Sequence, residues 1–230
     1  MESFIQTGCI SLDKLLGGGF PTRSLSLIYG EAETGKTSLA IQCVVNCARK
    51  GLKSLFIDND GTFSYERLSQ IAEYDYERIS PLIIIIRPTT FQEQTKAIDH
   101  LEKVINQKFG LIVVDTLTSL YCVETDSKKG TFAVNRELNR QLAVLTQIAK
   151  TLGIAVIINS QVRSFPVKEK TELKPVAMRV QNFWSDIVID MKKTGQTGVV
   201  QVMREKHPKI KGKGAIYVKL DNTGIVDYKH

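Results

Sequence analysis

The amino-acid sequence predicts one α/β domain in which helices cover both faces of a twisted, mostly parallel sheet. Three observations support this fold class. A phosphate-loop pattern occupies residues 30–37. Short apolar runs alternate with segments of helical periodicity over the first 160 residues, which is typical of parallel strands joined by helices. After residue 186, apolar and polar residues alternate instead, which indicates a small C-terminal antiparallel extension.

The phosphate loop reads Gly-Glu-Ala-Glu-Thr-Gly-Lys-Thr and fits the pattern G-x-x-x-x-G-K-[ST]. In this pattern backbone N–H groups wrap a polyphosphate, the Lys reaches its terminal phosphates and the Thr binds Mg²⁺. A strand predicted at residues 24–29 and a helix at residues 38–50 put the loop at a helix N-terminus, where the helix dipole favours negative charge. A glycine-rich turn that matches by accident would not have this context.

Polar residues follow three further apolar runs, at residues 53–58, 111–115 and 154–158. Because the carboxyl ends of parallel strands line the ligand crevice, Asp58 and Asp60 are expected near the phosphates. Asp115 is the last residue of its predicted strand. In nucleotide-hydrolysing proteins, an acid at this position orients a water on Mg²⁺. Asn159, Ser160 and Gln161 would place polar side chains where a terminal phosphate can be sensed.

The remaining elements follow from periodicity and composition. We expect helices at residues 64–73, 91–108 and 132–152, and a strand covered on both faces at residues 82–86. Polar sequence predicts loops at residues 121–131 and 163–176, the second of them mobile. Alternation predicts antiparallel strands at residues 187–191, 199–203 and 215–220.

Composition limits the function classes. The chain of 230 residues has no apolar run long enough to span a membrane and no N-terminal signal pattern, so we expect a soluble, intracellular protein. Its cysteines form no C-x-x-C pair, which favours buried reduced thiols over a metal site. The histidines lack ligand spacing, and we assign none of them to a metal.

The net charge of +7 is unevenly distributed. Basic and acidic residues number 17 each through Ser160, but 14 and 7 from Gln161 onward. A localised basic excess is typical of a polyanion partner, most often nucleic acid, and equally of a solvated basic face.

Several segments together resemble the ATPase core of the RecA/RadA recombinases. They are Thr-Gly-Cys-Ile-Ser-Leu-Asp-Lys-Leu-Leu-Gly-Gly-Gly before the phosphate loop, Phe-Ile-Asp-Asn-Asp-Gly-Thr-Phe-Ser-Tyr-Glu-Arg-Leu after it, Asp115, and Asn-Ser-Gln-Val at residues 159–162. The resemblance covers nearly the whole chain from residue 3 and is greatest to the short archaeal members. It implies a single RecA-like ATPase domain over residues 1–230, without the family's N-terminal helical DNA-binding domain. It also implies that the strand at 154–158 lies between the strands that carry the phosphate loop and Asp115.

The resemblance implies roles for individual residues. Lys36 would bind the β- and γ-phosphates, and Thr37 and Asp115 would hold Mg²⁺. Asp60 would position the attacking water, and Gln161 would link the γ-phosphate to DNA. The residues expected to contact ATP are Gly30, Glu31, Ala32, Glu33, Thr34, Gly35, Lys36, Thr37, Ser38 and, against the adenine, Arg67.

DNA would be bound chiefly by the loop at residues 163–176. The residues expected to contact it are Arg163, Phe165, Lys168, Lys170 and Lys174. Four cations in that loop suit phosphates, and the aromatic ring suits a stacked base. The loop at residues 121–131 would be a second DNA contact.

The function implied is that of an ATP- and DNA-binding accessory protein of homologous recombination and DNA repair, with weak ATPase activity. Its cofactors would be ATP and Mg²⁺. Its partners would be DNA, preferably single-stranded, the main recombinase RadA and a Holliday junction resolvase, in the archaeal cytoplasm and nucleoid. The alternatives are an active strand-exchange recombinase and a nucleotide-gated module that never hydrolyses ATP.

Four departures from the family pattern shape this expectation. Asp60 is one methylene shorter than the usual Glu, and a catalytic group misplaced by about 1 Å can lose about a hundredfold in rate, so hydrolysis should be slow. Glu33 replaces a small residue and, with Glu31, should weaken the binding of a tetra-anion. Cys122 replaces a DNA-contacting Arg. Without a docking segment before the core, a homodimer is expected rather than long filaments.

Other residues keep two interpretations. Asp60 precedes Gly61 and also suits a turn. Arg204 and Lys206 are candidate cations for a neighbouring protomer's γ-phosphate, or residues of an exposed edge strand. The lysines at positions 209, 211 and 213 would bind DNA or protect a sheet edge.

Overall fold

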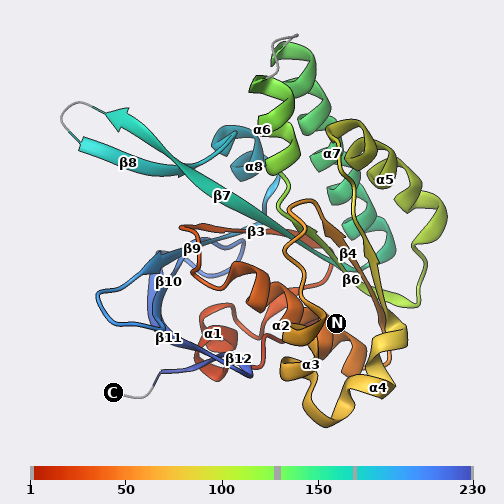
Figure 1. The fold of residues 1–230 in the computed structure, drawn as a ribbon, viewed down its shortest axis with the longest axis vertical. Helices are drawn as coiled ribbons and strands as arrows, with labels where there is room; N and C mark the ends of the chain where they lie inside the picture. Colours follow the sequence, from red (N-terminus) through yellow and green to blue (C-terminus); the bar gives the residue numbers. More distant parts are fainter. Residues whose placement is uncertain (1–2, 127–130, 168–169, 229–230) are drawn as a thin grey trace.

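The computed structural model describes residues 3–126, 131–167 and 170–228. One large sheet lies between two layers of helices (Figure 1), so the predicted α/β class is confirmed. The strand order is β12-β11-β10-β9-β3-β7-β6-β4-β5. A separate two-stranded ribbon joins β1 (Phe4–Ile5) to β2 (Phe20–Pro21).

The strands from β9 to β5 run parallel to one another. In spatial order they are β9 (Ile187–Lys193), β3 (Ser24–Gly30), β7 (Ala155–Val167), β6 (Phe109–Asp115), β4 (Lys53–Asp58) and β5 (Ile83–Ile86). The sheet then continues with antiparallel strands, which are β10 (Val199–Lys206), β11 (Gly214–Asp221) and β12 (Gly224–Asp227). Strand β7 lies between β3 and β6, as the resemblance implied.

Helices cover both faces of the sheet (Figure 1). One layer contains α1 (Ile10–Leu15), α2 (Lys36–Arg49), α3 (Tyr65–Ala72) and α4 (Tyr76–Ile79), with short 3₁₀ turns at Glu73–Asp75 and Ser80–Leu82. The other contains α5 (Phe91–Val104), α6 (Ser119–Asp126), α7 (Thr131–Leu152) and α8 (Met178–Trp184). Among the described helices, none is long and apolar enough to cross a membrane.

The central strands are apolar at nearly every position because both of their faces are buried. On β6, Val113 belongs to the core beneath α2, whereas Val114 belongs to the core beneath α7. Side chains alternate between the faces of a strand, so Asp115 returns to the α2 face at the end of β6. The α2 face therefore carries the polar residues that end the parallel strands.

Two expectations about the sheet and its helices were wrong, and a third was incomplete. Strand β5 is half-buried rather than covered on both faces, because it lies at the sheet edge with β4 as its neighbour. Strand β9 pairs antiparallel with β10, as its alternating pattern suggested, but it is also parallel to β3 on its other side. Alternation reports burial and says nothing about the direction of a neighbour. Helix α5 ends at Val104, four residues before the predicted end.

Both predicted polar loops contain regular structure. Strand β7 continues beyond the sheet to Val167 and pairs antiparallel with β8 (Lys170–Pro175), forming a projecting hairpin (Figure 1). The mobile loop predicted at residues 163–176 is thus corrected to a hairpin, in which ladder hydrogen bonds supply order that side-chain periodicity did not reveal. In the other segment, α6 extends to Asp126 and α7 begins at Thr131. Residues 127–130 lie outside the described chain.

Candidate nucleotide-binding site

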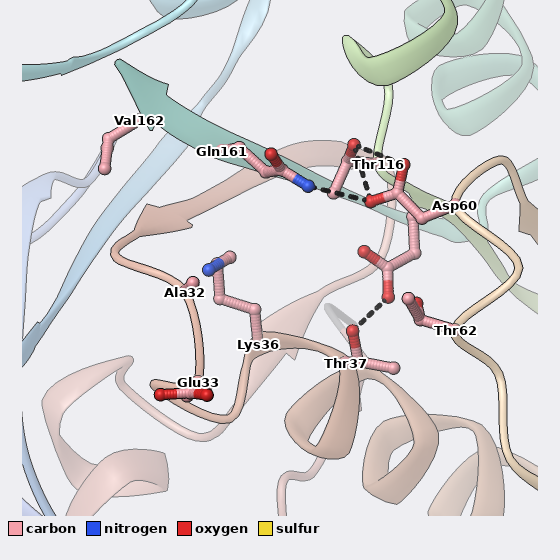
Figure 2. A pocket seen from close by; sticks show the side chains of 10 residues that line it. Ala32, Glu33, Lys36, Thr37, Asp60, Thr62, Thr116, Gln161 and Val162 are labelled. Atoms are coloured by element: carbon pink, nitrogen blue, oxygen red, sulfur yellow. Dashed lines mark hydrogen bonds between the residues drawn. The ribbon is translucent and has the colours of Figure 1, made fainter. Parts of the chain in front are cut away.

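Polar residues from the ends of neighbouring parallel strands surround a cavity of about 260 Å³ (Figure 2). They come from the loop between β3 and α2, the first residues of α2, the segment after β4, the end of β6 with the residue after it, and the middle of β7, where it leaves the main sheet. The lining residues are Ala32, Glu33, Lys36, Thr37, Asp60, Thr62, Asp115, Thr116, Gln161 and Val162. The structure therefore brings Lys36, Thr37, Asp60, Asp115 and Gln161 to one place.

Backbone geometry explains the glycine that opens the phosphate loop. Gly30 has φ of +151°, and a Cβ there would lie 2.0 Å from the carbonyl oxygen of Met191 on β9. A side chain at this position would push β9 away from β3. Gly35, at the N-cap of α2, has φ of +87°, a left-handed conformation that glycine adopts at little cost.

Lys36 is 7 % exposed and lies across its own loop. Its Nζ donates hydrogen bonds to the carbonyl oxygens of Gly30, at 2.9 Å, and Glu31, at 2.6 Å. Burial lowers the pKa of Lys36, and the nearby Asp115 carboxyl opposes this shift. A polyphosphate would offer this ammonium charged acceptors in place of neutral carbonyl oxygens.

Thr37 and Asp115 are in direct contact: the threonine Oγ1 donates to Asp115 Oδ2 at 2.6 Å. Asp115 is 1 % exposed, and burial raises its pKa to about 6 against the lowering effect of the Thr37 hydrogen bond. Within the described chain its other oxygen, Oδ1, is buried without a hydrogen-bond partner. Hard oxygen ligands, one of them unpaired, fit Mg²⁺.

The Asp60 carboxylate is held between β6 and β7 (Figure 2). Gln161 Nε2 donates to Asp60 Oδ2 at 3.1 Å, and Thr116 Oγ1 donates to the same oxygen at 3.2 Å. These bonds fix Asp60 facing the cavity, on the side opposite the phosphate loop. Gln161, the last residue of β7 that pairs with β3 before the strand continues into the hairpin, thus contacts the predicted catalytic acid directly.

Asp58 does not line the cavity, contrary to the expectation that it lies near the phosphates. Its buried carboxylate accepts hydrogen bonds from the backbone N–H groups of Thr62 and Phe63. It also forms an ion pair with Arg87 at 3.0 Å. Asp58 therefore shapes the turn that presents Asp60.

Arg67 lies beside the start of α2. Its Nε donates to Ser38 Oγ at 3.3 Å, and its Nη2 and Nη1 donate to the carbonyl oxygens of Asp221, at 2.6 Å, and Asn222, at 3.0 Å. This position, at the entrance to the nucleotide helix, is compatible with a base-contacting arginine. Its predicted contact with adenine stays a prediction.

Sequence reasoning missed two residues at the site. Thr116, immediately after Asp115, is a polar residue at a strand end, which is a signal that was available. Lys193 on β9 forms an ion pair with Glu33 at 2.8 Å and lowers the pKa of that glutamate. No sequence pattern connects these two residues, which are 160 positions apart.

The predicted DNA-binding residues fall on the β7–β8 hairpin, except Lys168, which lies outside the described residues. Side chains between 163 and 175 are also outside the description. By backbone register, Arg163 pairs with Lys174, and Phe165 pairs with Glu172. Cys122, in the other predicted DNA segment, is buried on α6.

The two candidate cations for a neighbouring protomer are bonded within this chain. Arg204 is 6 % exposed and donates to the carbonyl oxygens of Leu15, at 2.5 Å, and Gly212, at 3.3 Å. Lys206 Nζ donates to carbonyl oxygens at the end of α8. Both residues therefore connect elements of the fold.

The sheet order, the phosphate loop and the acid at the end of β6 define a RecA-like P-loop domain. Comparison with known proteins agrees with this class: the chain belongs to the Rad51 family, whose sequence profile matches residues 3–228.

The chain is similar to archaeal proteins called "DNA repair and recombination protein RadB". It is 37% identical to that of Methanococcoides burtonii over 201 residues, which cover 87% of this chain and 88% of the relative. It is 36% identical to that of Thermococcus onnurineus, with 97% of each chain covered. A crystal structure of the RadB recombinase superimposes with a TM-score of 0.84 at 33% identity, covering 98% of this chain and all of that one.

Proposed function

We propose that this chain binds ATP with Mg²⁺, binds single-stranded DNA, and acts as an accessory protein of homologous recombination and DNA repair with slow, DNA-dependent ATP hydrolysis. One observation carries the proposal: Lys36, Thr37, Asp60, Asp115 and Gln161 meet around a single cavity. Membership of the Rad51 family and the names of the RadB relatives support the setting in recombination and repair.

The side chains suggest how hydrolysis proceeds. Lys36 would leave its loop carbonyls and stabilise charge on the γ-phosphate, while Asp60 positions a water for in-line attack. Mg²⁺, when bound by Thr37 and Asp115, would neutralise charge on the phosphates. Asp60 is short and is already held by Thr116 and Gln161, which supports slow turnover.

The hairpin supplies a physical route from ATP to DNA. Gln161 contacts Asp60 and belongs to β7, the strand that continues into the hairpin. DNA on the hairpin would shift this strand and so change the position of Asp60. We place RadA, and a Holliday junction resolvase, as the protein partners of a single-domain chain that acts in the archaeal cytoplasm and nucleoid.

Nucleotide affinity and turnover test the enzymatic part, with and without single-stranded DNA. In Lys36→Ala, ATP affinity should fall about 30- to 100-fold, because a charged donor to the phosphates is lost. In Asp60→Glu, turnover should rise about tenfold or more, because the carboxylate reaches further. Unchanged ATP affinity in Lys36→Ala would refute the site. Fast wild-type turnover with filaments would instead indicate a strand-exchange recombinase, and no turnover in any variant would indicate a pure nucleotide switch.

Salt-dependent DNA binding tests the hairpin. If its four cations contact phosphates, log affinity should fall with log salt at a slope of about −3, and at about −1.4 in Lys170→Ala/Lys174→Ala. The matched control is Lys209→Ala/Lys211→Ala, which removes the same charge from the turn between β10 and β11. If the control changes the slope and the hairpin variant does not, the DNA site lies at that turn.

A further inference from the structure

Asn159 is a fully buried amide that the mechanism above does not use. It lies on β7, paired with Ile28 of β3 on one side. On the other side, β6 pairs Val114 with Ile158, so the next position brings Asn159 beside Asp115. Both residues fall on the α2 face of the sheet, under the phosphate loop, because each follows by two positions a residue of that core.

The Asn159 side chain lacks the partners that a buried amide normally has. Neither Nδ2 nor Oδ1 has a hydrogen-bond partner within the described chain, and the neighbouring Asp115 Oδ1 is unpaired as well. The backbone carbonyl oxygen of Asn159 does have a partner, since it accepts a hydrogen bond from the N–H of Leu117. Burying an unpaired amide costs free energy, so an apolar residue would suit the ligand-free fold better.

The unpaired atoms match the chemistry expected beside a hydrated cation. Asp115 and Thr37 offer the oxygen ligands, and Mg²⁺ keeps several of its waters when it is bound with a nucleotide. An amide provides a donor for the ligating carboxylate and an acceptor for a metal-bound water, which are the two functions that outer residues perform around metal sites.

We propose that Asn159 is a positioning residue for the magnesium–nucleotide complex. Its Nδ2 orients the Asp115 carboxylate, and its Oδ1 accepts a hydrogen bond from a water on the cation. The proposal rests on the proposed nucleotide-binding function and adds to it a residue of this chain that acts through Asp115 rather than on the phosphates.

Ser26 provides a matched control. It is also fully buried, its hydroxyl also lacks a partner in the described structure, and it lies on β3 opposite Ile157, one step further from the crevice on the same face. Removing either polar group removes the free-energy cost of burying an unpaired polar atom. Only the loss of the amide should change the Mg²⁺ dependence of nucleotide binding.

The test measures thermal unfolding in a chelator and the affinity of a fluorescent ADP analogue across a Mg²⁺ titration. For Asn159→Leu, we expect a melting temperature equal to or above that of wild type, and about a tenfold higher Mg²⁺ concentration for half-maximal nucleotide binding. Nucleotide affinity without Mg²⁺ should be unchanged. Ser26→Ala should keep the wild-type Mg²⁺ dependence.

Asn159→Ala serves as the second variant if leucine prevents folding. The inference is overturned if a folded Asn159 variant has the wild-type Mg²⁺ dependence, or if it loses the same nucleotide affinity with and without Mg²⁺. If wild type itself shows no Mg²⁺-dependent nucleotide binding, the proposed function fails and the role of Asn159 fails with it. The two failures are therefore distinguishable.

Discussion

The parallel and antiparallel parts of the sheet use their charged residues differently. Strands β3, β4 and β6 end at the same edge, where β7 continues beyond the sheet, so the polar residues at this edge gather around one cavity. Strands β10, β11 and β12 alternate in direction, and their ends are divided between opposite edges. Parallel geometry concentrates side chains into a site, whereas antiparallel geometry disperses them.

In the antiparallel part, charged residues hold the fold together. Asp227 on β12 accepts hydrogen bonds from the backbone N–H groups of Ile10 and Ser11, at the N-terminus of α1. Arg204 on β10 donates to Leu15 O, at the other end of the same helix. The short α1 is thus fixed at both ends by the extension. A basic excess in the last 70 residues therefore does not by itself mean a binding surface.

The largest effect on stability is expected from Arg204→Met. This change removes the charged donor from two carbonyl oxygens, those of Leu15 and Gly212, and should lower the free energy of unfolding by about 2 to 4 kcal/mol. Nucleotide affinity should stay within about twofold of wild type, because Arg204 does not line the cavity. Denaturant unfolding and nucleotide titration measure the two quantities.

The opposite result would contradict the conclusion that charged residues of the antiparallel part stabilise the fold rather than bind nucleotide. If Arg204→Met unfolds like wild type but loses ATP affinity or turnover, the residue acts at a nucleotide site after all. Arg204→Lys, which retains a donor, should recover part of the lost stability.

A smaller and pH-dependent effect is expected from Asp115→Asn in the parallel part. Burial raises the folded-state pKa of Asp115 from 3.8 to about 6. Below about pH 3.8 both states hold the proton, so ionisation costs no stability. As pH rises toward 6 the unfolded state ionises first, and the free energy of unfolding falls; above that range the penalty is constant. Asparagine has no such penalty.

Asp115→Asn should therefore stabilise the ligand-free protein by about 1 to 3 kcal/mol at pH 8 in a chelator, and by less at pH 5. It should also weaken Mg²⁺-dependent nucleotide binding. Denaturant unfolding at several pH values measures the first effect. A gain that is equal at pH 5 and pH 8 would show that the ionisation of Asp115 is not its cause.

The sequence predicted the parallel core and the residues around the cavity well, for a physical reason. Fully buried strands need continuous apolar runs, and the phosphate loop needs its glycines and lysine in a fixed spacing. These are local requirements, so Lys36, Thr37 and Asp115 could be predicted as neighbours at one site before the fold was known. The structure then brought them together at one cavity.

What the sequence did not predict depends on pairing between distant segments. The β7–β8 hairpin is ordered by cross-strand hydrogen bonds, and β9 is parallel because of the path that the chain takes to reach β3. Arg204 was ambiguous because its partners, Leu15 and Gly212, come from separate elements. The unpaired amide of Asn159 becomes visible only when the neighbours of β7 are known.

The smallest effect is expected from Lys193, where the two parts of the sheet meet beside the phosphate loop. The Glu33–Lys193 pair is exposed, so Lys193→Ala should leave the free energy of unfolding nearly unchanged. Without its lysine, however, Glu33 adds an uncompensated negative charge to the loop. Repulsion between this carboxylate and the phosphates should make the affinity for ATP about fivefold weaker.

A double-mutant cycle isolates this effect. In the Glu33→Ala background, Lys193→Ala should weaken ATP binding less than it does in wild type, because no carboxylate remains to be neutralised. The difference between backgrounds should shrink in high salt, where exposed charges are screened. If Lys193→Ala costs the same affinity in both backgrounds, the lysine contacts the nucleotide itself, and the phosphate-binding chemistry of the parallel edge extends onto β9 as well.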